Sequence, residues 1–270
     1  MSLLRILACG DIHLELKLFN EVLELVKNEK IDLLILPGDF CNARALDSDA
    51  KVNDFLLQAN PLVKILEKID IPIFFVLGNH DPVELGPILS NNPFVSNLHG
   101  RRIRWNNYVF GGIGGSHMVP PQLLKLTIPF IERGFSQEIY DKGFKLTRKI
   151  SSDNTSIFLY SNVPKMYQDA FPCDILITHT PPLLLNDKEY NISSSGIYEL
   201  ISRYKPMLCI SGHIHNPKKP VRTASWIEEP KQTVKETTLI SLGSIDNKTF
   251  FLIELNRNNK KIEEIEKISI

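Results

Sequence analysis

Potential metal ligands follow five separate apolar runs of this chain, each time shortly after the run ends. The runs are 4–8, 33–36, 74–77, 175–178 and 208–211. The residues that follow them are Asp11, His13, Asp39, Asn79, His80, Asp81, His179, His213 and His215. Five of the seven histidines of the chain belong to this set. Scattered structural histidines would not be expected to follow the ends of apolar runs in this way.

The residue types of this set indicate metal chemistry. Carboxylate and imidazole side chains suit borderline divalent ions such as Mn, Fe, Co, Ni or Zn. Two such ions about 3.5–4 Å apart can hold both the attacking and the leaving oxygen of an in-line displacement, and they lower the pKa of a bound water. A bridging carboxylate is needed to keep two ions this close, and Asp39 is the candidate. The set therefore predicts a dinuclear site that activates water.

The elements predicted in the first half place these residues at one edge of a sheet. Strands are predicted at 3–8, 31–36 and 71–77, and helices at 15–29 and 48–69. The Asn60-Pro61 pair is predicted to interrupt the second helix. This β-α-β-α-β order favours a parallel, buried sheet. Because ligands of open α/β sheets bind at the carboxyl ends of the strands, the polar segments should meet there.

The second half of the chain is less regular. Strands are predicted at 108–111, 174–178, 207–211, 238–242 and 249–255, and a helix at 196–204. The last two strands, a turn at 256–259 and the segment up to 270, in which isoleucines are interspersed with charged residues, are expected to form an antiparallel tail. The segment 112–155 contains prolines at 120, 121 and 129, and we interpret it as an insertion or cap over the site. No linker divides the chain, so a single domain spanning 1–270 is the simpler prediction.

The composition restricts the partners and the location of the protein. Lys and Arg number 31, as do Asp and Glu, so a formal net charge of zero gives no general reason to expect a polyanionic partner. The four cysteines form no Cys-x-x-Cys pair and lie in or beside predicted strands, which favours buried thiols in a reducing compartment. The start of the chain lacks a signal-peptide pattern, and no apolar stretch reaches the roughly 18–20 residues of a membrane helix. A cytoplasmic protein without a membrane partner is expected.

The five segments resemble, in order, the motifs of the calcineurin-like metallophosphoesterases. These motifs are Asp-x-His, Gly-Asp, Gly-Asn-His-Asp, a single His and Gly-His-x-His, and here they span residues 11 to 215. The resemblance implies an α/β fold, in which mixed sheets with a parallel core are flanked by helices in an α-β-β-α sandwich. It also implies two divalent metal ions, and hydrolysis of a phosphodiester or phosphomonoester by a hydroxide that bridges them.

The resemblance further implies a role for each residue. One ion would be bound by Asp11, His13 and His215, the other by Asn79, His179 and His213, and Asp39 would be shared. His80 would contact the scissile phosphate and help to protonate the leaving oxygen instead of binding metal. Asp81 would orient His80 from behind.

The segment after the Gly-Asp pair departs from the family pattern. Many relatives carry a second Asp where this chain has Asn42, and protein phosphatases add an Arg that comes here one residue late, as Arg44. A phosphoprotein substrate is therefore less favoured. A second, weaker resemblance, in 97–100, 111–116, 179–182 and 212–215, is to the cyclic-nucleotide-phosphodiesterase-like branch, which implies a small phosphate-ester substrate. Arg44, and His117 after the glycine-rich turn, are candidates for substrate contacts.

Two other functions remain as alternatives. Double-strand-break repair nucleases share the motif set, but zero net charge and the lack of a long aromatic and basic segment count against a nucleic-acid substrate. A non-enzymatic scaffold on this fold, such as a retromer subunit that resembles the family, can lose the catalytic histidine. Here His80 and every proposed ligand are present. The sequence leaves the choice between diester and monoester, the metal identity and the oligomeric state open.

Overall fold

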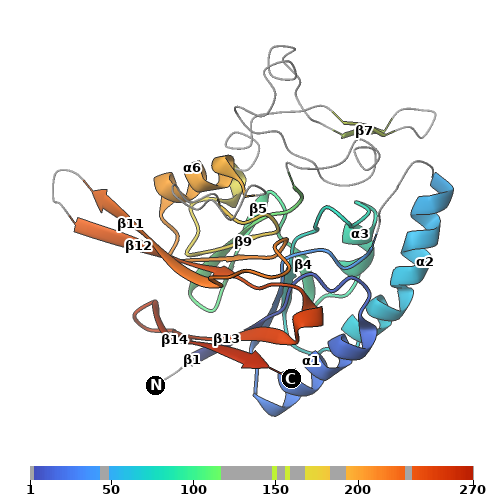
Figure 1. Ribbon diagram of the computed structural model, residues 1–270, viewed down its shortest axis with the longest axis horizontal. Coiled ribbons are helices and arrows are strands. Elements are labelled where there is room, and N and C mark those ends of the chain that lie inside the picture. Colours follow the sequence, from blue (N-terminus) through green and yellow to red (C-terminus); the bar gives the residue numbers. More distant parts are fainter. Residues whose placement is uncertain are drawn as a thin grey trace.

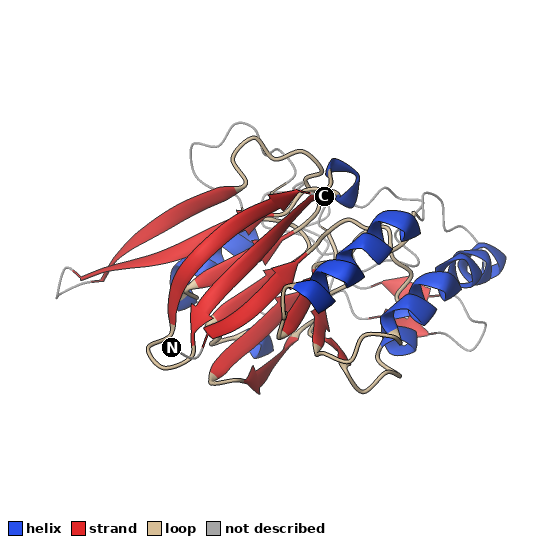
Figure 2. Ribbon diagram, turned by 90° about the horizontal axis from the view of Figure 1, so that it is seen from below, coloured by secondary structure: helices blue, strands red, loops and turns tan. Residues whose placement is uncertain are grey.

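Two six-stranded sheets pack face to face in the computed structural model, with helices on their outer surfaces (Figure 1). The structure describes residues 3–42, 49–116, 148–150, 156–158, 168–182, 193–228 and 233–269. Figure 2 shows the strands grouped together and the helices outside them. This arrangement confirms the α/β sandwich of mixed sheets and flanking helices that the resemblance implied.

The first sheet contains the β-α-β-α-β unit predicted from the sequence, and its strand order is β14-β13-β1-β2-β3-β4. Its strands are β1 (Leu3–Ala8), β2 (Leu33–Leu36), β3 (Ile73–Phe75), β4 (Val95–Asn97), β13 (Thr249–Asn256) and β14 (Lys261–Ser269). The crossovers are α1 (Leu16–Asn28) and α2 (Asp49–Leu66), and the short α3 (Leu85–Leu89) precedes β4. Strands β1 to β4 pair in parallel, whereas β13 is antiparallel to both β1 and β14.

The second sheet has the strand order β11-β12-β10-β9-β6-β5. Its strands are β5 (Arg101–Trp105), β6 (Tyr108–Ile113), β9 (Ile175–Thr178), β10 (Leu208–Ser211), β11 (Val221–Glu228) and β12 (Thr233–Ser241). Strands β6, β9, β10 and β12 pair in parallel, and the outer β5 and β11 are antiparallel. Helix α6 (Ser195–Tyr204) joins β9 to β10, and its N-cap Ser194 accepts a hydrogen bond from Ile197 N.

Four short elements complete the described chain. Strands β7 (Arg148–Ile150) and β8 (Ser156–Phe158) form a separate two-stranded sheet. The 3-10 helices η2 (Gln168–Ala170) and η3 (Ile245–Asn247) precede β9 and β13.

Alternate residues of the central strands face two different hydrophobic cores. In β1, Leu4 and Ile6 face the second sheet, where they pack in one cluster with residues such as Phe110 and Ile177. Leu7 faces the opposite way, into the cluster that α1 and α2 cover. A third cluster joins α6 to the outer face of the second sheet. Because both faces are buried, these strands appear in the sequence as continuous apolar runs.

The expected antiparallel tail is confirmed only in its last part, and the expected break in the second helix is wrong. Strands β13 and β14 pair antiparallel across the turn that follows Asn256, whereas β12 lies in the second sheet, parallel to β10, and does not pair with β13. Helix α2 continues through Pro61. The fully buried Ala59 and Leu62 keep this part of the helix on the core, although a proline inside a helix costs about 3 kcal/mol.

The cysteines and the helices agree with the expectations from composition. Cys9, Cys41, Cys173 and Cys209 are buried free thiols. Burial raises the pKa of the Cys209 thiol to about 12, so it stays protonated at neutral pH. In the part of the chain that the structure describes, no helix combines the length and apolar character needed to cross a bilayer.

Candidate metal centre

The loops that carry the predicted ligands meet at one edge of the sandwich. His13 N donates to Asp39 O over 2.9 Å, so the pairing of β1 and β2 continues into their loops. His80 N, after β3, donates to Asp39 Oδ1 over 2.8 Å. His213 N, after β10 of the second sheet, donates to Asp11 Oδ1 over 3.0 Å. Loops of both sheets are thus joined at the carboxyl ends of their strands, as the sequence predicted.

The potential ligand atoms form two groups that share Asp39. The first group is Asp11, His13, Asp39 and His215, and the second is Asp39, His179 and His213; within each group the ligand atoms lie within 4.8 Å of one another. Asp39 Oδ2 lies 3.8 Å from His13 Nε2 and 3.3 Å from His179 Nε2, so it faces one histidine of each group. Asn79 Oδ1 lies 2.8 Å from His179 Nε2, which places Asn79 beside the second group.

Histidine nitrogens within each group have the spacing of ligands on one ion. His13 Nε2 is 3.0 Å from His215 Nε2, and His213 Nδ1 is 3.2 Å from His179 Nε2. Two nitrogens that are each about 2.0–2.1 Å from the same ion lie roughly 2.9–3.4 Å apart, depending on the coordination angle. Both observed distances fall in this interval.

The loop after β2 orients one histidine of each group. His13 Nδ1 lies 3.0 Å from Cys41 O, and His179 Nδ1 lies 2.8 Å from Pro37 O. Since a carbonyl oxygen can only accept, Nδ1 carries a proton in both rings, which leaves Nε2 as the atom that can bind an ion. Sequence reasoning missed both contacts, because a backbone acceptor has no signature in residue type.

The two carboxylates of the first group divide their oxygens between the backbone and the site. Asp11 Oδ1 accepts from His213 N, whereas Asp11 Oδ2 is buried and has no hydrogen-bond partner in the described part of the chain. Asp39 Oδ1 accepts from His80 N, and Asp39 Oδ2 faces the histidines. A buried carboxylate oxygen without a partner is costly. The Asp11 carboxylate lies near the imidazole nitrogens of His13 and His215, so a divalent cation fits as the missing partner of Oδ2.

The electrostatics of the cluster support the same interpretation. Burial and the neighbouring Asp39 raise the pKa of Asp11 to about 8 and that of Asp81 to about 7. Burial also opposes ionisation of Asp39, but the surrounding histidines, His179 foremost, hold its pKa below the ordinary range. Burial opposes protonation of His179, yet Asp39 outweighs it and raises the pKa to about 9. Three buried carboxylates thus compete for too little positive charge, a deficit that divalent cations would correct.

Four of the predicted ligands have an unusual backbone conformation. The φ angle is 48° at Asp11, 47° at His13, 55° at Asp39 and 69° at His213. Residues other than glycine rarely adopt this left-handed region, which costs of the order of 1–3 kcal/mol each. Strain of this kind collects at functional sites, and four of the eleven non-glycine residues with a positive φ in the described chain are predicted ligands.

Most of the chain matches the model of a known protein family. The family model for calcineurin-like phosphoesterases matches residues 4–217, which is most of the chain. The chain belongs to this family. In the calcineurin-like phosphoesterase described here, all seven predicted ligands lie within the matched region.

Relatives of this calcineurin-like phosphoesterase include one curated protein from Methanocaldococcus jannaschii, named 2-phospho-L-lactate transferase. The two are 27% identical over 189 residues, which cover 68% of this chain and 54% of the relative. The chain thus spans about half the length of that relative. Among solved structures, TT1561 of Thermus thermophilus is similar with a TM-score of 0.56 at 14% identity, over 99% of both chains. Another has a TM-score of 0.62 at 13% identity, over 99% of this chain and 100% of the other. At such identities the likeness concerns the fold alone.

The last two residues of the Gly-Asn-His-Asp segment have different surroundings. The half-buried His80 ring meets His13 edge-on, with ring centroids 5.4 Å apart, so it stands beside the first ligand group. The Asp81 carboxylate is fully buried. Its two oxygens accept hydrogen bonds from Cys41 N (2.9 Å) and Gly78 N (2.7 Å). The expected action of Asp81 on His80 stays a prediction.

Two glycines allow the loops after β2 and β3 to approach each other closely. Gly38 has a φ of 96°, and a Cβ added to it would lie 2.5 Å from Gly78 N. A Cβ added to Gly78 would lie 2.0 Å from Asp39 Oδ1. Neither position has room for a side chain, so the position of Asp39 depends on both glycines.

The two predicted substrate contacts, Arg44 and His117, lie outside the described residues. The same holds for 117–147 and 151–155 of the predicted insertion. The described part of that insertion comprises its first residues, 112–116, and strand β7.

The glycine-rich turn before His117 is fixed between the loops that follow β3 and β9. Gly115 N donates to Leu77 O over 2.8 Å, and Thr180 Oγ1 donates to Gly115 O over 3.1 Å. Gly114 N donates to His99 Nδ1 over 2.9 Å. Burial lowers the pKa of His99 to about 4, so the ring stays neutral and can accept this bond. His99 therefore supports the turn and lies outside both ligand groups.

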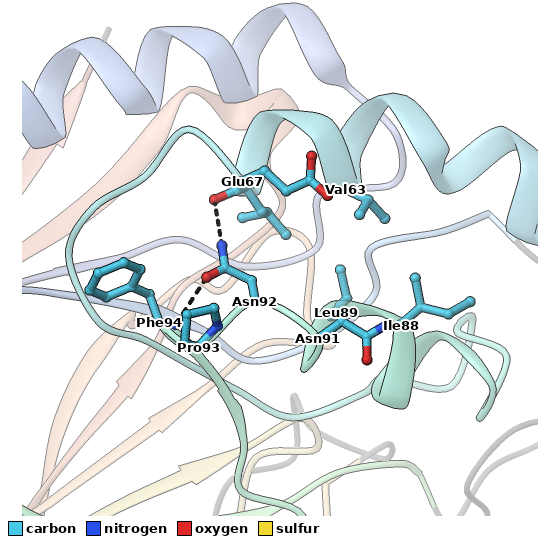
Figure 3. A pocket seen from close by; sticks show the side chains of 9 residues that line it. Val63, Glu67, Ile88, Leu89, Asn91, Asn92, Pro93 and Phe94 are labelled. Atoms are coloured by element: carbon cyan, nitrogen blue, oxygen red, sulfur yellow. Dashed lines mark hydrogen bonds between the residues drawn. The ribbon is translucent and has the colours of Figure 1, made fainter.

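A separate cavity of about 310 Å³ lies between α2 and the segment that follows α3 (Figure 3). Its walls include Val63, Ile88 and Phe94, and Asn92 closes one side by donating to Leu66 O over 3.4 Å. Among the described residues that line it, Glu67 is the only titratable one, and none of the predicted ligands takes part. The cavity is therefore distinct from the metal centre.

Proposed function

We propose that this calcineurin-like phosphoesterase is an enzyme that uses two divalent ions to hydrolyse a small phosphate ester, either a diester or a monoester. The observation that carries the proposal is the sharing of Asp39 by two groups of ligand atoms. Ions bound there would polarise the phosphate and lower the pKa of the water that attacks it in line.

The side chains supply the geometry for this reaction. Asp39 presents one oxygen to His13 and His179 together, and its other oxygen is held by the backbone of His80. The carbonyls behind His13 and His179 fix both rings with Nε2 toward the shared carboxylate. A substrate phosphate bound at the centre would therefore meet ligands that need little reorganisation, which is the general basis of electrostatic catalysis.

We assign His80 as the group that acts on the leaving oxygen. Its ring is half-buried and adjoins His13 of the first ligand group. From this position its imidazole can contact a phosphate oxygen and give a proton to the leaving oxygen, which then departs as an alcohol. The balanced charge of the chain supports a small ester over a polyanion.

Hydrolysis assays with reconstituted protein would test the proposal. Protein stripped with a chelator should cleave neither an aryl phosphodiester nor its monoester, and turnover should return with one or more of Mn, Fe, Co, Ni, Zn and Mg added singly. The ratio of diester to monoester cleavage would then define the substrate class. 2-Phospho-L-lactate, the compound in the curated relative's name, is a further monoester to assay. A chain that binds no divalent ion would overturn the proposal.

A further inference from the structure

Two aspartates exchange hydrogen bonds between the loops that follow β2 and β3. The His80 N–H donates to Asp39 Oδ1 over 2.8 Å, and the Cys41 N–H donates to Asp81 Oδ1 over 2.9 Å. Each carboxylate thus holds the backbone of the loop to which the other aspartate belongs. Asp81 Oδ2 accepts from Gly78 N over 2.7 Å, so both oxygens of Asp81 are engaged.

Cys41, which Asp81 holds by its N–H, in turn supports His13. The Cys41 carbonyl accepts from His13 Nδ1 over 3.0 Å. The next residue, Asn42, donates from Nδ2 to His13 O over 2.8 Å. The ring and the backbone of His13 are therefore both fixed by a short segment whose position depends on the bond between Cys41 and Asp81.

The residue type at position 81 matches this task. Asp81 is fully buried, and burial of a carboxylate is costly unless strong hydrogen bonds offset it. A carboxylate can accept from two N–H groups at once. An amide has one acceptor oxygen and would turn its own NH₂ group toward one of the two donors. Aspartate at position 81, unlike asparagine, can therefore accept from the N–H groups of both Cys41 and Gly78.

The second ligand group is supported from other parts of the fold. His179 N donates to Ile113 O, at the end of β6, over 3.0 Å. His179 Nδ1 lies 2.8 Å from Pro37 O, which directly follows β2 and precedes the segment that Asp81 holds. Loss of the Asp81 bonds should consequently disturb the first group more than the second.

We propose that Asp81 is a positioning residue for the first ligand group: through the backbone of Cys41 it fixes His13 and so sets the affinity of that group for a divalent ion. This inference rests on the two-metal centre proposed above. Loss of a group that orients a metal-binding histidine typically lowers metal affinity by about 10–100-fold, and we expect a change of that size at the first group.

Titration of metal-free protein with Mn²⁺, followed by calorimetry and by electron paramagnetic resonance of bound Mn²⁺, tests the proposal. The wild-type chain should show two classes of site. In Asp81→Asn, one class should bind roughly 10–100-fold more weakly while the other is unchanged. His215→Ala removes a ligand of the first group and identifies the class. In that background, Asp81→Asn should leave the remaining class unaltered.

Asp174→Asn is a matched control for the general effect of losing a tethering carboxylate. Asp174 Oδ2 accepts from Val109 N over 2.7 Å and from Lys260 Nζ over 2.8 Å. These bonds lie at the amino ends of β6 and β9, opposite the metal centre. Asp174→Asn should therefore leave both classes of Mn²⁺ site intact.

Several outcomes would overturn the proposal. Unchanged affinities in Asp81→Asn would show that Asp81 does not act on the first group. An equal loss in both classes would show that its effect is not specific to that group and would overturn the proposal as well. Normal Mn²⁺ binding with the hydrolysis defect of His80→Ala would show that it acts on His80 instead. A wild-type chain that binds neither Mn²⁺ nor any of Fe, Co, Ni, Zn and Mg would remove the proposed function and this inference together.

A second measurement needs no variant, and it applies if Asp81→Asn fails to fold. Amide hydrogen exchange of metal-free wild-type protein should show a protected Cys41 N–H, since its partner Asp81 Oδ1 is buried. Exchange of Cys41 at the rate of an exposed amide would overturn the proposal.

Discussion

His13 Nε2 lies 3.0 Å from His215 Nε2, although 202 positions separate the two residues along the chain. Two neutral imidazole nitrogens at this distance repel through their lone pairs unless a proton or a cation lies between them. Because His13 follows β1 of the first sheet and His215 follows β10 of the second, a cation held by both also joins the sheets. Occupancy of this group should therefore affect the stability of the whole sandwich.

Divalent metal should stabilise the fold. A ligand that binds only the native state at a concentration one hundred times its Kd adds about 2.7 kcal/mol to the free energy of unfolding. Differential scanning calorimetry of chelated protein, with and without added Mn²⁺, should show a higher Tm with the ion. His215→Ala should gain less from the same addition. Identical Tm values in wild-type protein with and without metal would refute this expectation.

The stability of the metal-free chain should fall as the pH rises from about 6.5 to 9. The folded pKa of Asp11 is raised to about 8, and that of His179 from 6.5 to about 9. When the pKa of a group is higher in the folded state than in the unfolded state, the group stabilises the fold fully at a pH below its unfolded-state pKa. This stabilisation is lost as the pH rises through its folded-state pKa. For His179 this loss begins near pH 6.5, and for Asp11 it continues up to about pH 8.

Denaturant unfolding of chelated protein at a series of pH values would measure this decline. Asp11→Asn removes one of the titrating groups at nearly constant shape, so its curve should be flatter up to about pH 8. A wild-type chain whose metal-free stability rises between pH 6.5 and 8 would contradict the sign of the effect.

His80→Ala should keep its metal and lose most of its turnover. His80 is outside both ligand groups, and proton transfer by a positioned side chain typically contributes about 10²–10⁴-fold to the rate. The measurement is kcat for an aryl phosphodiester, together with the metal content of the same sample. A near-normal kcat would show that the role assigned to His80 is wrong.

Asp39→Ala should lose metal at both positions, because Asp39 is the residue that the two ligand groups share. Equilibrium dialysis followed by elemental analysis would count the bound ions. Asp32→Ala offers a control, since Asp32 pairs with Arg257 and lies before β2, at its other end. Two tightly bound ions in Asp39→Ala would rule out a bridging role.

Gly78→Ala should abolish metal binding, whereas Gly10→Ala should be tolerated. The new methyl group at position 78 would lie 2.0 Å from Asp39 Oδ1 and must displace it. At position 10 the nearest atoms would be 3.4 Å away, which is ordinary van der Waals contact. Metal counts and thermal unfolding of the two variants would compare the sites directly. Equal metal binding by both would show that Asp39 can shift without harm.

The assembly of the site could be predicted because each ligand candidate follows an apolar run. Asp39 comes after β2 and His179 after β9, and both strands are buried along their whole length. Burial on both faces produces the continuous runs, and the parallel arrangement sends their carboxyl ends to one edge. That these residues bind metal stays a prediction, but their convergence is now a structural fact.

Other features had no signal in the sequence. Gly243 and η3 take the chain from β12 in one sheet to β13 in the other, and nothing in the apolar pattern of the two strands distinguishes this crossover from a hairpin. The orienting contacts of His13 and His179 are made by backbone carbonyls, which every residue possesses. Residue type therefore predicts which side chains gather, whereas backbone geometry decides how they are held.

The left-handed backbone of Asp11, His13, Asp39 and His213 has an evolutionary consequence. Glycine adopts this conformation without strain, so replacing one of these residues by glycine relieves a local cost even as it removes a ligand. In the absence of metal, selection for stability alone would therefore not retain them. A descendant of this chain released from the need for metal would be expected to lose its ligands by drift well before it lost its fold.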